Sequence, residues 1–245
     1  MTESTPTNLE SETTSESKGV VLVHAELSDI GMRREENQDS YGVIETPSAK
    51  ILLVADGMGG VKGGAIASNL AVKVMREALT GKEQVAPADI SAAVQSSNAQ
   101  IYEQGLSDSS LSGMGTTMVG LCFNQDKLIV FNVGDSRAYR ARQNHLTKLT
   151  VDHTLVMELL KSGTISAEQV QNHPVSHMLT RSLGPAEEVA VDCSFCRDDP
   201  QKGDRYLLCS DGLYNLVKDE EILAILQSNP VDLACQLLVN LANQR

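Results

Sequence analysis

Three strand-like segments in the middle of the chain follow one another closely, and this spacing constrains the fold more than any other feature. They are TTMVGLCF (116–123), KLIVFNVG (127–134) and RAYRAR (137–142). Parallel strands need a connection of about a dozen residues or more, whereas links as short as these fit antiparallel hairpins. We therefore expect an α+β fold of antiparallel sheets with helices on their outer faces, and not a doubly wound parallel sheet.

Other segments supply the remaining strands and helices. Apolar residues recur at helical spacing between Gly63 and Leu79, and Gly81 closes that stripe. Residues 1–18 are mostly Thr, Ser and Glu, which predicts a disordered tail before a single domain at 19–245. Further helices are predicted at 87–102, 154–161, 219–227 and 231–243, and further strands at 20–27, 40–45, 189–196 and 205–210.

Two apolar runs of strand length each end at an Asp-Gly pair. They are ILLVADGMGG (51–60), which contains Asp56, and DRYLLCSDGLYN (204–215), which contains Asp211. A carboxylate at the end of a buried strand is costly unless something neutralises its charge. Glycine beside such a carboxylate lets the backbone approach a bound ion closely. Both strand ends are therefore candidate ligand positions.

Two more aspartates, Asp39 in RREENQDSYG and Asp135 in FNVGDSRAY, lie in similar places at the ends of predicted strands. Hard divalent cations such as Mg²⁺ and Mn²⁺ prefer carboxylate, carbonyl and water oxygens. Each aspartate taken alone also fits a turn residue that hydrogen-bonds locally. Four of them at strand ends, two followed by glycine, indicate a carboxylate metal site.

Composition excludes several classes of function. The 245 residues carry a formal net charge of −12, whereas a protein that binds nucleic acid or an anionic membrane needs a basic face. The apolar runs are too short to span a bilayer. GMGGVKGG has neither of the glycine spacings typical of nucleotide loops. The five cysteines favour a reducing cytoplasm over a disulfide framework, and Cys193 and Cys196 fit a half-buried strand better than a zinc site.

Six stretches of the chain resemble the bacterial form of the metal-dependent serine/threonine protein phosphatases, the PPM or type 2C family. They appear in the order of the family and extend from about residue 20 to the end of the chain. The resemblance implies an αββα sandwich of two antiparallel sheets, with a two-metal site at one end of the sheets. The stretches are GMRREENQDSYG, VADGMGG, GMGTTMVG, NVGDSRAYR, HMLTRSLG and LCSDGLYN.

The resemblance also implies a set of metal ligands. Asp56 corresponds to the ligand that bridges two Mn²⁺ or Mg²⁺ ions. The carbonyl oxygen of Gly57 would bind one ion and the carboxylate of Asp211 the other. Asp135 corresponds to a ligand of a third, weaker ion in the bacterial relatives.

The remaining roles concern water and substrate. Asp39 stands where the family holds metal-bound water, and Arg34 where it clamps the substrate phosphate, a task that suits the planar fork of arginine. Residues from about 150 to 177 correspond to the flap, which touches substrate. The implied reaction is hydrolysis by a water that two metal ions activate, so it needs no protein nucleophile.

The chain departs from the family pattern in two regions. Where many relatives carry a histidine after the Asp-Gly pair, this chain has Met58 and Val61, and a glutamate common in the bacterial loop is Ala65. The sequence stops at VNLANQR (239–245), short of a last strand and of an aspartate that relatives use as a metal ligand. We therefore expect this strand to be absent, through truncation or true loss, and metal binding at Asp211 to be weakened.

Two functions are compatible with these features. The first is an active phosphatase that acts on phosphoserine and phosphothreonine in the protein substrates of a kinase, as a cytoplasmic monomer with neither nucleic-acid nor membrane partners. The second is a non-catalytic domain that binds a phosphoprotein or a signalling partner through the same face. Retention of all the site residues named above favours the first. We interpret the histidines near the flap as structural or surface residues; these are His153, His173 and His177.

Overall fold

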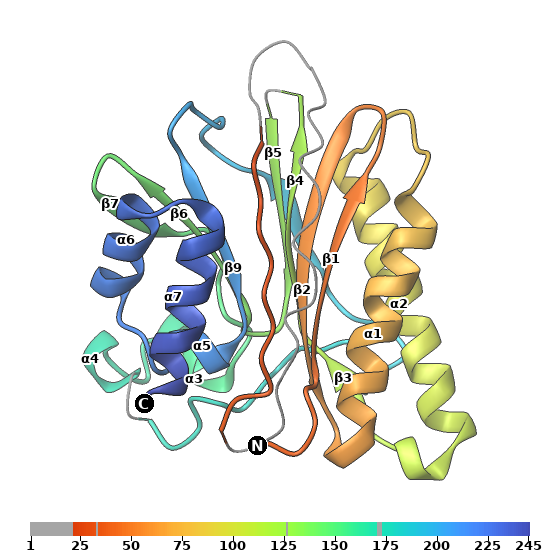
Figure 1. Ribbon diagram of the computed structural model, residues 1–245. Helices are drawn as coiled ribbons and strands as arrows, with labels where there is room; N and C mark the ends of the chain where they lie inside the picture. The colour runs from red at the N-terminus through yellow and green to blue at the C-terminus, as the bar shows by residue number, and fades with distance from the viewer. Residues whose placement is uncertain (1–21, 33, 126, 171–172) are drawn as a thin grey trace, which may run out of the picture.

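The structure is a computed structural model, and it describes residues 22–32, 34–125, 127–170 and 173–245. The tail predicted at 1–18 lies outside these residues. Two antiparallel sheets lie at the centre of the molecule, and helices cover the outer face of each (Figure 1). The α+β fold and the αββα arrangement are therefore confirmed. None of the helices in the described residues combines the length and the apolar character needed to cross a membrane.

The first sheet has the strand order β1-β2-β4-β5-β8, and the short strand β3 pairs with β2. Every pairing in it is antiparallel, and the predicted hairpin between 116–123 and 127–134 is confirmed as β4 and β5. The hairpin predicted between 127–134 and 137–142 is wrong, because the chain turns at Gly134, with a φ of +104°, from β5 in this sheet to β6 in the other. The second sheet has the order β7-β6-β9 and is antiparallel too. The strand bounds are β1 Asp39–Glu45, β2 Ala49–Met58, β3 Gly115–Thr116, β4 Met118–Asn124, β5 Lys127–Val133, β6 Arg137–Arg142, β7 His145–Lys148, β8 Asp192–Phe195 and β9 Arg205–Cys209.

The helices divide between the two sheets. The long helices α1 and α2 pack on the first sheet, and α6 and α7 cover the second (Figure 1). The region predicted as the flap contains two short helices, α3 and α4. The helix bounds are α1 Gly60–Leu79, α2 Pro87–Ser107, η1 Ser109–Leu111, α3 Leu155–Lys161, α4 Ala167–Val170, α5 Asp211–Tyr214, α6 Asp219–Ser228 and α7 Val231–Asn243.

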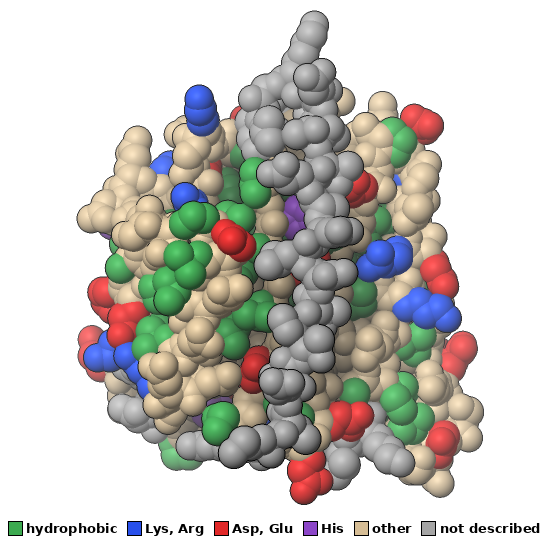
Figure 2. Space-filling model, viewed as in Figure 1, with side chains coloured by type: hydrophobic (Ala, Val, Ile, Leu, Met, Phe, Trp, Pro, Cys, Tyr) green, Lys and Arg blue, Asp and Glu red, His purple; other side chains and the backbone are tan. Residues whose placement is uncertain are grey.

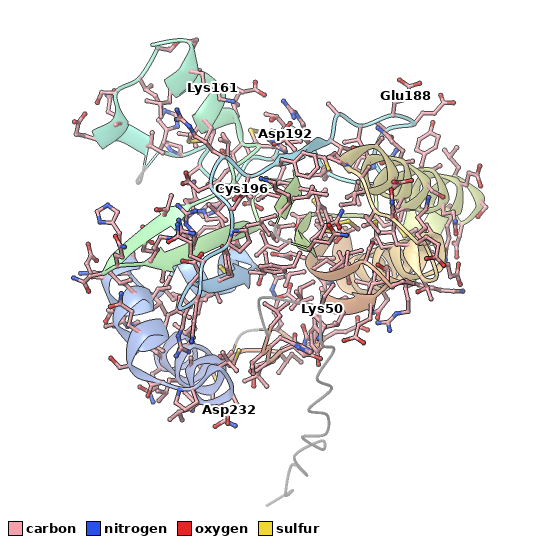
Figure 3. The ribbon with its side chains drawn as sticks, turned by 90° about the horizontal axis from the view of Figure 1, so that it is seen from above. Lys50, Lys161, Glu188, Asp192, Cys196 and Asp232 are labelled. Atoms are coloured by element: carbon pink, nitrogen blue, oxygen red, sulfur yellow. The ribbon has the colours of Figure 1, made fainter. Side chains whose placement is uncertain are left out.

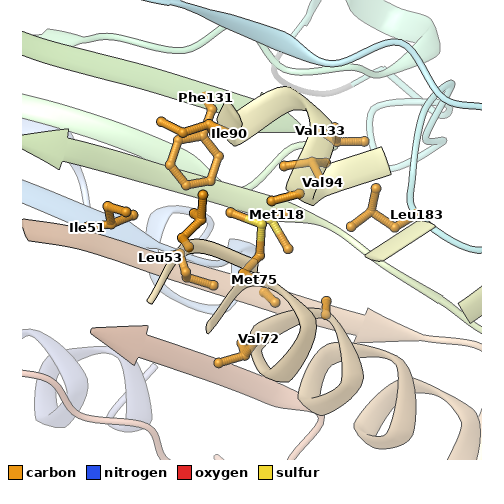
Figure 4. Close-up of a cluster of buried hydrophobic side chains, with 14 of the residues drawn as sticks. Ile51, Leu53, Val72, Met75, Ile90, Val94, Met118, Phe131, Val133 and Leu183 are labelled. Carbon is orange, nitrogen blue, oxygen red and sulfur yellow. The ribbon is translucent and has the colours of Figure 1, made fainter. Parts of the chain in front are cut away.

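The largest hydrophobic core lies between the first sheet and its two helices (Figure 4). Strand β2 alternates buried and half-buried residues along its whole length, so Ile51 and Leu53 face this core. Met75 of α1 and Phe131 of β5 are also fully buried in it, and each such side chain contributes about 1.5–3 kcal/mol of burial free energy. This core holds β2 rigidly and so fixes the strand end that carries Asp56.

One predicted strand is absent and one observed strand was not predicted. The strand expected at 20–27 is wrong for the part described, because residues 22–30 form no ladder with any described strand. A strand needs a neighbour to satisfy its backbone groups, and the segment 22–32 instead lines, together with β9, a cavity of about 1170 Å³. The described partner of β9 is β6 alone. Strand β7 was missed because HLTK is polar and mostly exposed.

Candidate metal centre

The ends of β1 and β2 bring two of the predicted aspartates together. Asp39 is the first residue of β1, and Asp56 lies near the end of β2, directly opposite it in the antiparallel register. Directly opposed residues of an antiparallel pair have Cβ atoms about 4.5–5.5 Å apart. Pairing of these two strands therefore accounts for the proximity of the two carboxylates, which are separated along the chain by a hairpin.

Two threonines fix the backbone of Asp56. The amide of Asp56 donates to Thr117 Oγ1 at 3.0 Å, and the amide of Thr117 donates to the Asp56 carbonyl oxygen at 2.9 Å. Thr116 Oγ1 donates to the same carbonyl oxygen at 3.0 Å. Because the main-chain groups of Asp56 are occupied in this way, only its carboxylate is left to bind a ligand.

Gly57 occupies a position at which a side chain has no room. A Cβ atom there would collide with the carbonyl oxygen of Gly64, near the start of α1, and would lie 2.7 Å from the carbonyl oxygen of Gln38. The amide of Gly57 donates to that same Gln38 oxygen at 3.1 Å. The glycine therefore permits the close approach of α1 to the end of β2. Its role as a carbonyl ligand stays a prediction.

A hydrogen bond between the two sheets brings the second Asp-Gly pair to Asp39, which lies opposite Asp56 of the first pair. Asp211 follows β9 and opens the short helix α5. The preceding residue, Ser210, donates from its hydroxyl to Asp39 Oδ2 at 2.7 Å, across 171 residues of sequence. Asn215 donates to Asp211 Oδ2 at 3.2 Å from one turn further along. The ends of β9 and β1 thus meet, as the repeated Asp-Gly pattern suggested.

Asp135 approaches the same region from the tight turn between β5 and β6. Its side chain is buried, and it accepts a hydrogen bond from the Tyr214 hydroxyl. The Tyr214 ring in turn lies under the Arg137 guanidinium, 3.5 Å from its carbon to the ring centroid. The pKa of Asp135 is raised to about 6, chiefly by burial and then by the charge of Asp211, while the Tyr214 bond opposes the rise.

The negative charges of neighbouring aspartates disfavour ionisation of Asp39, Asp56 and Asp135. Burial, together with the charges of the other three aspartates, raises the pKa of Asp56 to about 9. Burial also raises the pKa of Asp39, against the hydrogen bond from Ser210. Within the described residues, no Lys or Arg forms an ion pair with any of the four clustered aspartates.

Such a cluster matches the ligand chemistry of a hard divalent cation. Carboxylate oxygens are the donors that Mg²⁺ and Mn²⁺ prefer, and a bound cation would offset the mutual repulsion. Within the described residues, however, no three His, Cys, Asp or Glu side chains already enclose an ion position. The residues fit a cation site by type and charge, while their side chains do not form a closed ligand shell.

Arg34 lies at the border of this cluster. Its side chain is exposed, and it lines the same cavity as Asp39, Asp56 and Asp211. The charge of Arg34 lowers the pKa of Asp39, which places the guanidinium within electrostatic reach of that carboxylate. The structure therefore brings the predicted phosphate ligand to the edge of the carboxylate cluster and not into it.

Several residues around the centre were not found from the sequence. Thr117, Ser210 and Tyr214 each contact a predicted ligand or its backbone. All three lie within motifs that were recognised, GMGTTMVG for Thr117 and LCSDGLYN for Ser210 and Tyr214, so a hydroxyl side chain inside a motif was the available signal. The histidine interpretation is confirmed for His153, which is buried and hydrogen-bonded. All five cysteines are free, and Cys193 packs against the main core as predicted.

Comparisons with known proteins agree with this arrangement. The family model described as Protein phosphatase 2C matches residues 32–237. The serine/threonine phosphatase stp of Listeria welshimeri is 40% identical over 213 residues, which cover 84% of each chain. The crystal structure of the Mycobacterium tuberculosis serine/threonine phosphatase PstP/Ppp has a TM-score of 0.81 and 36% identity, and covers 89% of this chain and 90% of that one. A structure of the PstP catalytic domain in complex with two manganese ions has a TM-score of 0.75 and 34% identity, with the same coverage.

Proposed function

This chain belongs to the protein phosphatase 2C family and is a protein serine/threonine phosphatase, and we propose that two divalent ions held by its clustered aspartates carry out the reaction. The observation that supports this most strongly is the convergence of four carboxylates from both sheets without a Lys or Arg ion pair among the described residues. Buried charges of one sign need a counter-charge. A pair of divalent ions would supply it.

Each residue of the cluster has a distinct task in this proposal. Asp56 would hold both ions, because the other three aspartates all act on its carboxylate and its backbone is fixed by Thr117. Gly57 offers its carbonyl oxygen to one ion, and Asp211 offers its carboxylate to the other. When bound, such ions lower the pKa of water and polarise a phosphoryl oxygen. Asp39 orients that water, and the Ser210 hydroxyl holds its carboxylate in place.

Arg34 binds the phosphate group of the substrate. Its exposed guanidinium lies beside the cluster and can pair two phosphate oxygens at once. In this proposal the flap at 150–177 contacts the substrate protein around the phosphorylated residue. Asp135 holds a further, weaker ion at the side of the cluster nearest α5.

The substrates are phosphorylated proteins, which we propose to be the products of a Ser/Thr kinase in the cytoplasm. The free state of all five cysteines supports that compartment. We propose Mn²⁺ or Mg²⁺ as the metal, a monomer as the active form, and neither nucleic acid nor membrane as partners. The net charge of −12 supports the last point, and acidic side chains are distributed over the face shown in Figure 2. The similarity to phosphatases disfavours the non-catalytic alternative.

The test is hydrolysis of a phosphothreonine peptide by the purified chain. We expect turnover to require added Mn²⁺ or Mg²⁺ and to stop when a chelator is added. Asp56→Asn should lower turnover at least about a hundredfold, because loss of an ion's direct ligand exceeds the 10–100-fold effect typical of outer contacts. Asp232→Asn, at an exposed position in the first turn of α7, is the matched control and should retain activity. Equal turnover in the two variants would refute the proposed centre.

A further inference from the structure

His153 is buried at the point where the flap joins the domain. Its backbone belongs to a short antiparallel pairing that closes the base of the flap: the amide of Thr180 donates to the His153 carbonyl oxygen at 2.9 Å, and the amide of Leu155 donates to Met178 at 2.8 Å. The side chain of His153 is nearly inaccessible, with 2% exposure. If the base of the flap moves, the buried His153 side chain must move with it, and so must the groups that this side chain contacts.

Those contacts are made with the turn that carries Asp135. The amide of Gly134 donates to His153 Nδ1 at 3.1 Å, and the amide of His153 donates to the Gly134 carbonyl oxygen at 2.9 Å. His153 therefore contacts both main-chain groups of Gly134, and the carbonyl oxygen also accepts from Asn132 Nδ2 at 3.3 Å. Gly134 has a φ of +104°, and a Cβ there would lie 2.6 Å from Thr117, which fixes Asp56. The turn is thus held between the flap base and the strand end of the metal centre.

The hydrogen bond from Gly134 determines the tautomer of the His153 ring. Because Nδ1 accepts the Gly134 amide, the proton of the neutral ring resides on Nε2, which lies 3.1 Å from Asp192 Oδ2. Arg181 Nη1 donates to the other oxygen of Asp192 at 2.9 Å. Asp192 lies beside the flap, whose helix α3 carries Lys161 (Figure 3). Asp192 and Arg181 therefore fix the ring so that its accepting nitrogen faces Gly134.

We propose that His153 is a positioning residue, which holds the Gly134–Asp135 turn in register with the flap base and so sets the affinity of the Asp135 carboxylate for a divalent ion. This inference rests on the proposed function, because it takes Asp135 as a ligand. A second set of contacts connects the flap to Asp56. The segment that follows the flap pairs with β3, where the Leu183 amide donates to the Thr116 carbonyl oxygen at 2.8 Å and the Thr116 amide donates to the Leu183 carbonyl oxygen at 3.0 Å. Thr116 then donates to the carbonyl oxygen of Asp56.

Two amide variants separate the positioning role from simple packing. His153→Asn retains an acceptor oxygen close to the place of Nδ1, whereas His153→Gln retains a donor toward Asp192 and lacks the acceptor for Gly134. Both remove the ring, so both lose packing, and melting followed by circular dichroism checks that both fold. The readouts are hydrogen exchange of the Gly134 amide by NMR and Mn²⁺ binding by calorimetry, neither of which requires turnover.

We expect Gly134 exchange to be faster and Mn²⁺ binding to be weaker in His153→Gln, each by up to about tenfold, the effect of one hydrogen bond. His153→Asn should remain within about threefold of the wild type in both. Equal behaviour of the two variants, or an unchanged Gly134 amide in His153→Gln, would overturn the inference. Failure of the proposed function has a different signature, because the wild-type chain would then bind no Mn²⁺ whatever the Gly134 amide shows.

Discussion

Replacing Asp56 by asparagine should stabilise the metal-free protein, and the gain should grow with pH. The pKa of Asp56 is raised from 3.8 to about 9, first by burial and then by neighbouring carboxylates. Between these two values the unfolded chain has lost the proton that the folded protein retains. The folded state therefore binds more protons, and stability falls as pH rises through this window. Asparagine has no proton to lose, so the variant escapes this fall.

The structure sets the size of the effect. Each pH unit inside the window removes about 1.4 kcal/mol. At pH 8, about four units above the ordinary pKa, the cost of Asp56 reaches at most about 6 kcal/mol, and at pH 5 it is about 1.5 kcal/mol. The Asp56 carboxyl also interacts with Asp39 and lowers the pKa of that residue, and loss of this interaction lowers the realised gain. We expect at least about 2 kcal/mol at pH 8, or a rise in Tm of roughly 4 °C or more.

The assay is thermal unfolding in chelator at pH 5 and pH 8, followed by circular dichroism. Asp232→Asn serves as the control, because it removes the same charge from an exposed helix position. Added Mn²⁺ should reverse the order by stabilising the wild type alone. The reasoning is refuted if Asp56→Asn is no more stable than the wild type at pH 8, or if its gain is the same at both pH values.

Two further substitutions test neighbouring parts of the centre. Arg34→Ala should raise KM for a phosphothreonine peptide while Mn²⁺ affinity stays the same, because the partner of Arg34 is the substrate. The KM of Arg34→Lys should lie between those of the wild type and Arg34→Ala, since lysine keeps the charge and loses the planar fork. Loss of Mn²⁺ binding in Arg34→Ala, measured by calorimetry, would contradict this role. Thr117→Val should lower the free energy of unfolding by about 1–3 kcal/mol, because it leaves the Asp56 amide without its acceptor and Ser136 without its hydroxyl partner at 2.7 Å. Urea unfolding measures this, and an unchanged midpoint would show that the clamp on Asp56 is dispensable.

Local sequence features predicted much of the fold because the strands pair mainly with their neighbours along the chain. The short link between 116–123 and 127–134 forms the predicted hairpin of β4 and β5. The short link between 127–134 and 137–142 instead carries the chain from β5 in the first sheet to β6 in the second, so link length alone did not reveal the change of sheet. The strand expected at 20–27 failed for the opposite reason. An alternating apolar pattern shows that a segment can form a strand, but the neighbour it needs is not a local property.

The same distinction applies to the candidate site. Asp56 and Asp211 were recognisable because each ends an apolar run at an Asp-Gly pair. The bond from Ser210 to Asp39 joins positions 171 residues apart, and no local pattern contains it. The contact of His153 with Gly134 depends on how the flap returns to the domain. Ligand types were thus readable from the sequence, whereas the residues that position them required the packing of the two sheets.

The central claim is that the clustered aspartates hold two divalent ions side by side. Electron paramagnetic resonance of the Mn²⁺-loaded chain tests this directly, because two ions about 3.5–4 Å apart that share a carboxylate are magnetically coupled. We predict the spectrum of a coupled pair in the wild type and in Asp232→Asn, and its loss in Asp56→Asn, the variant that lacks the bridge. A spectrum of isolated Mn²⁺ alone in the wild-type protein, at saturating metal, would contradict the two-ion centre.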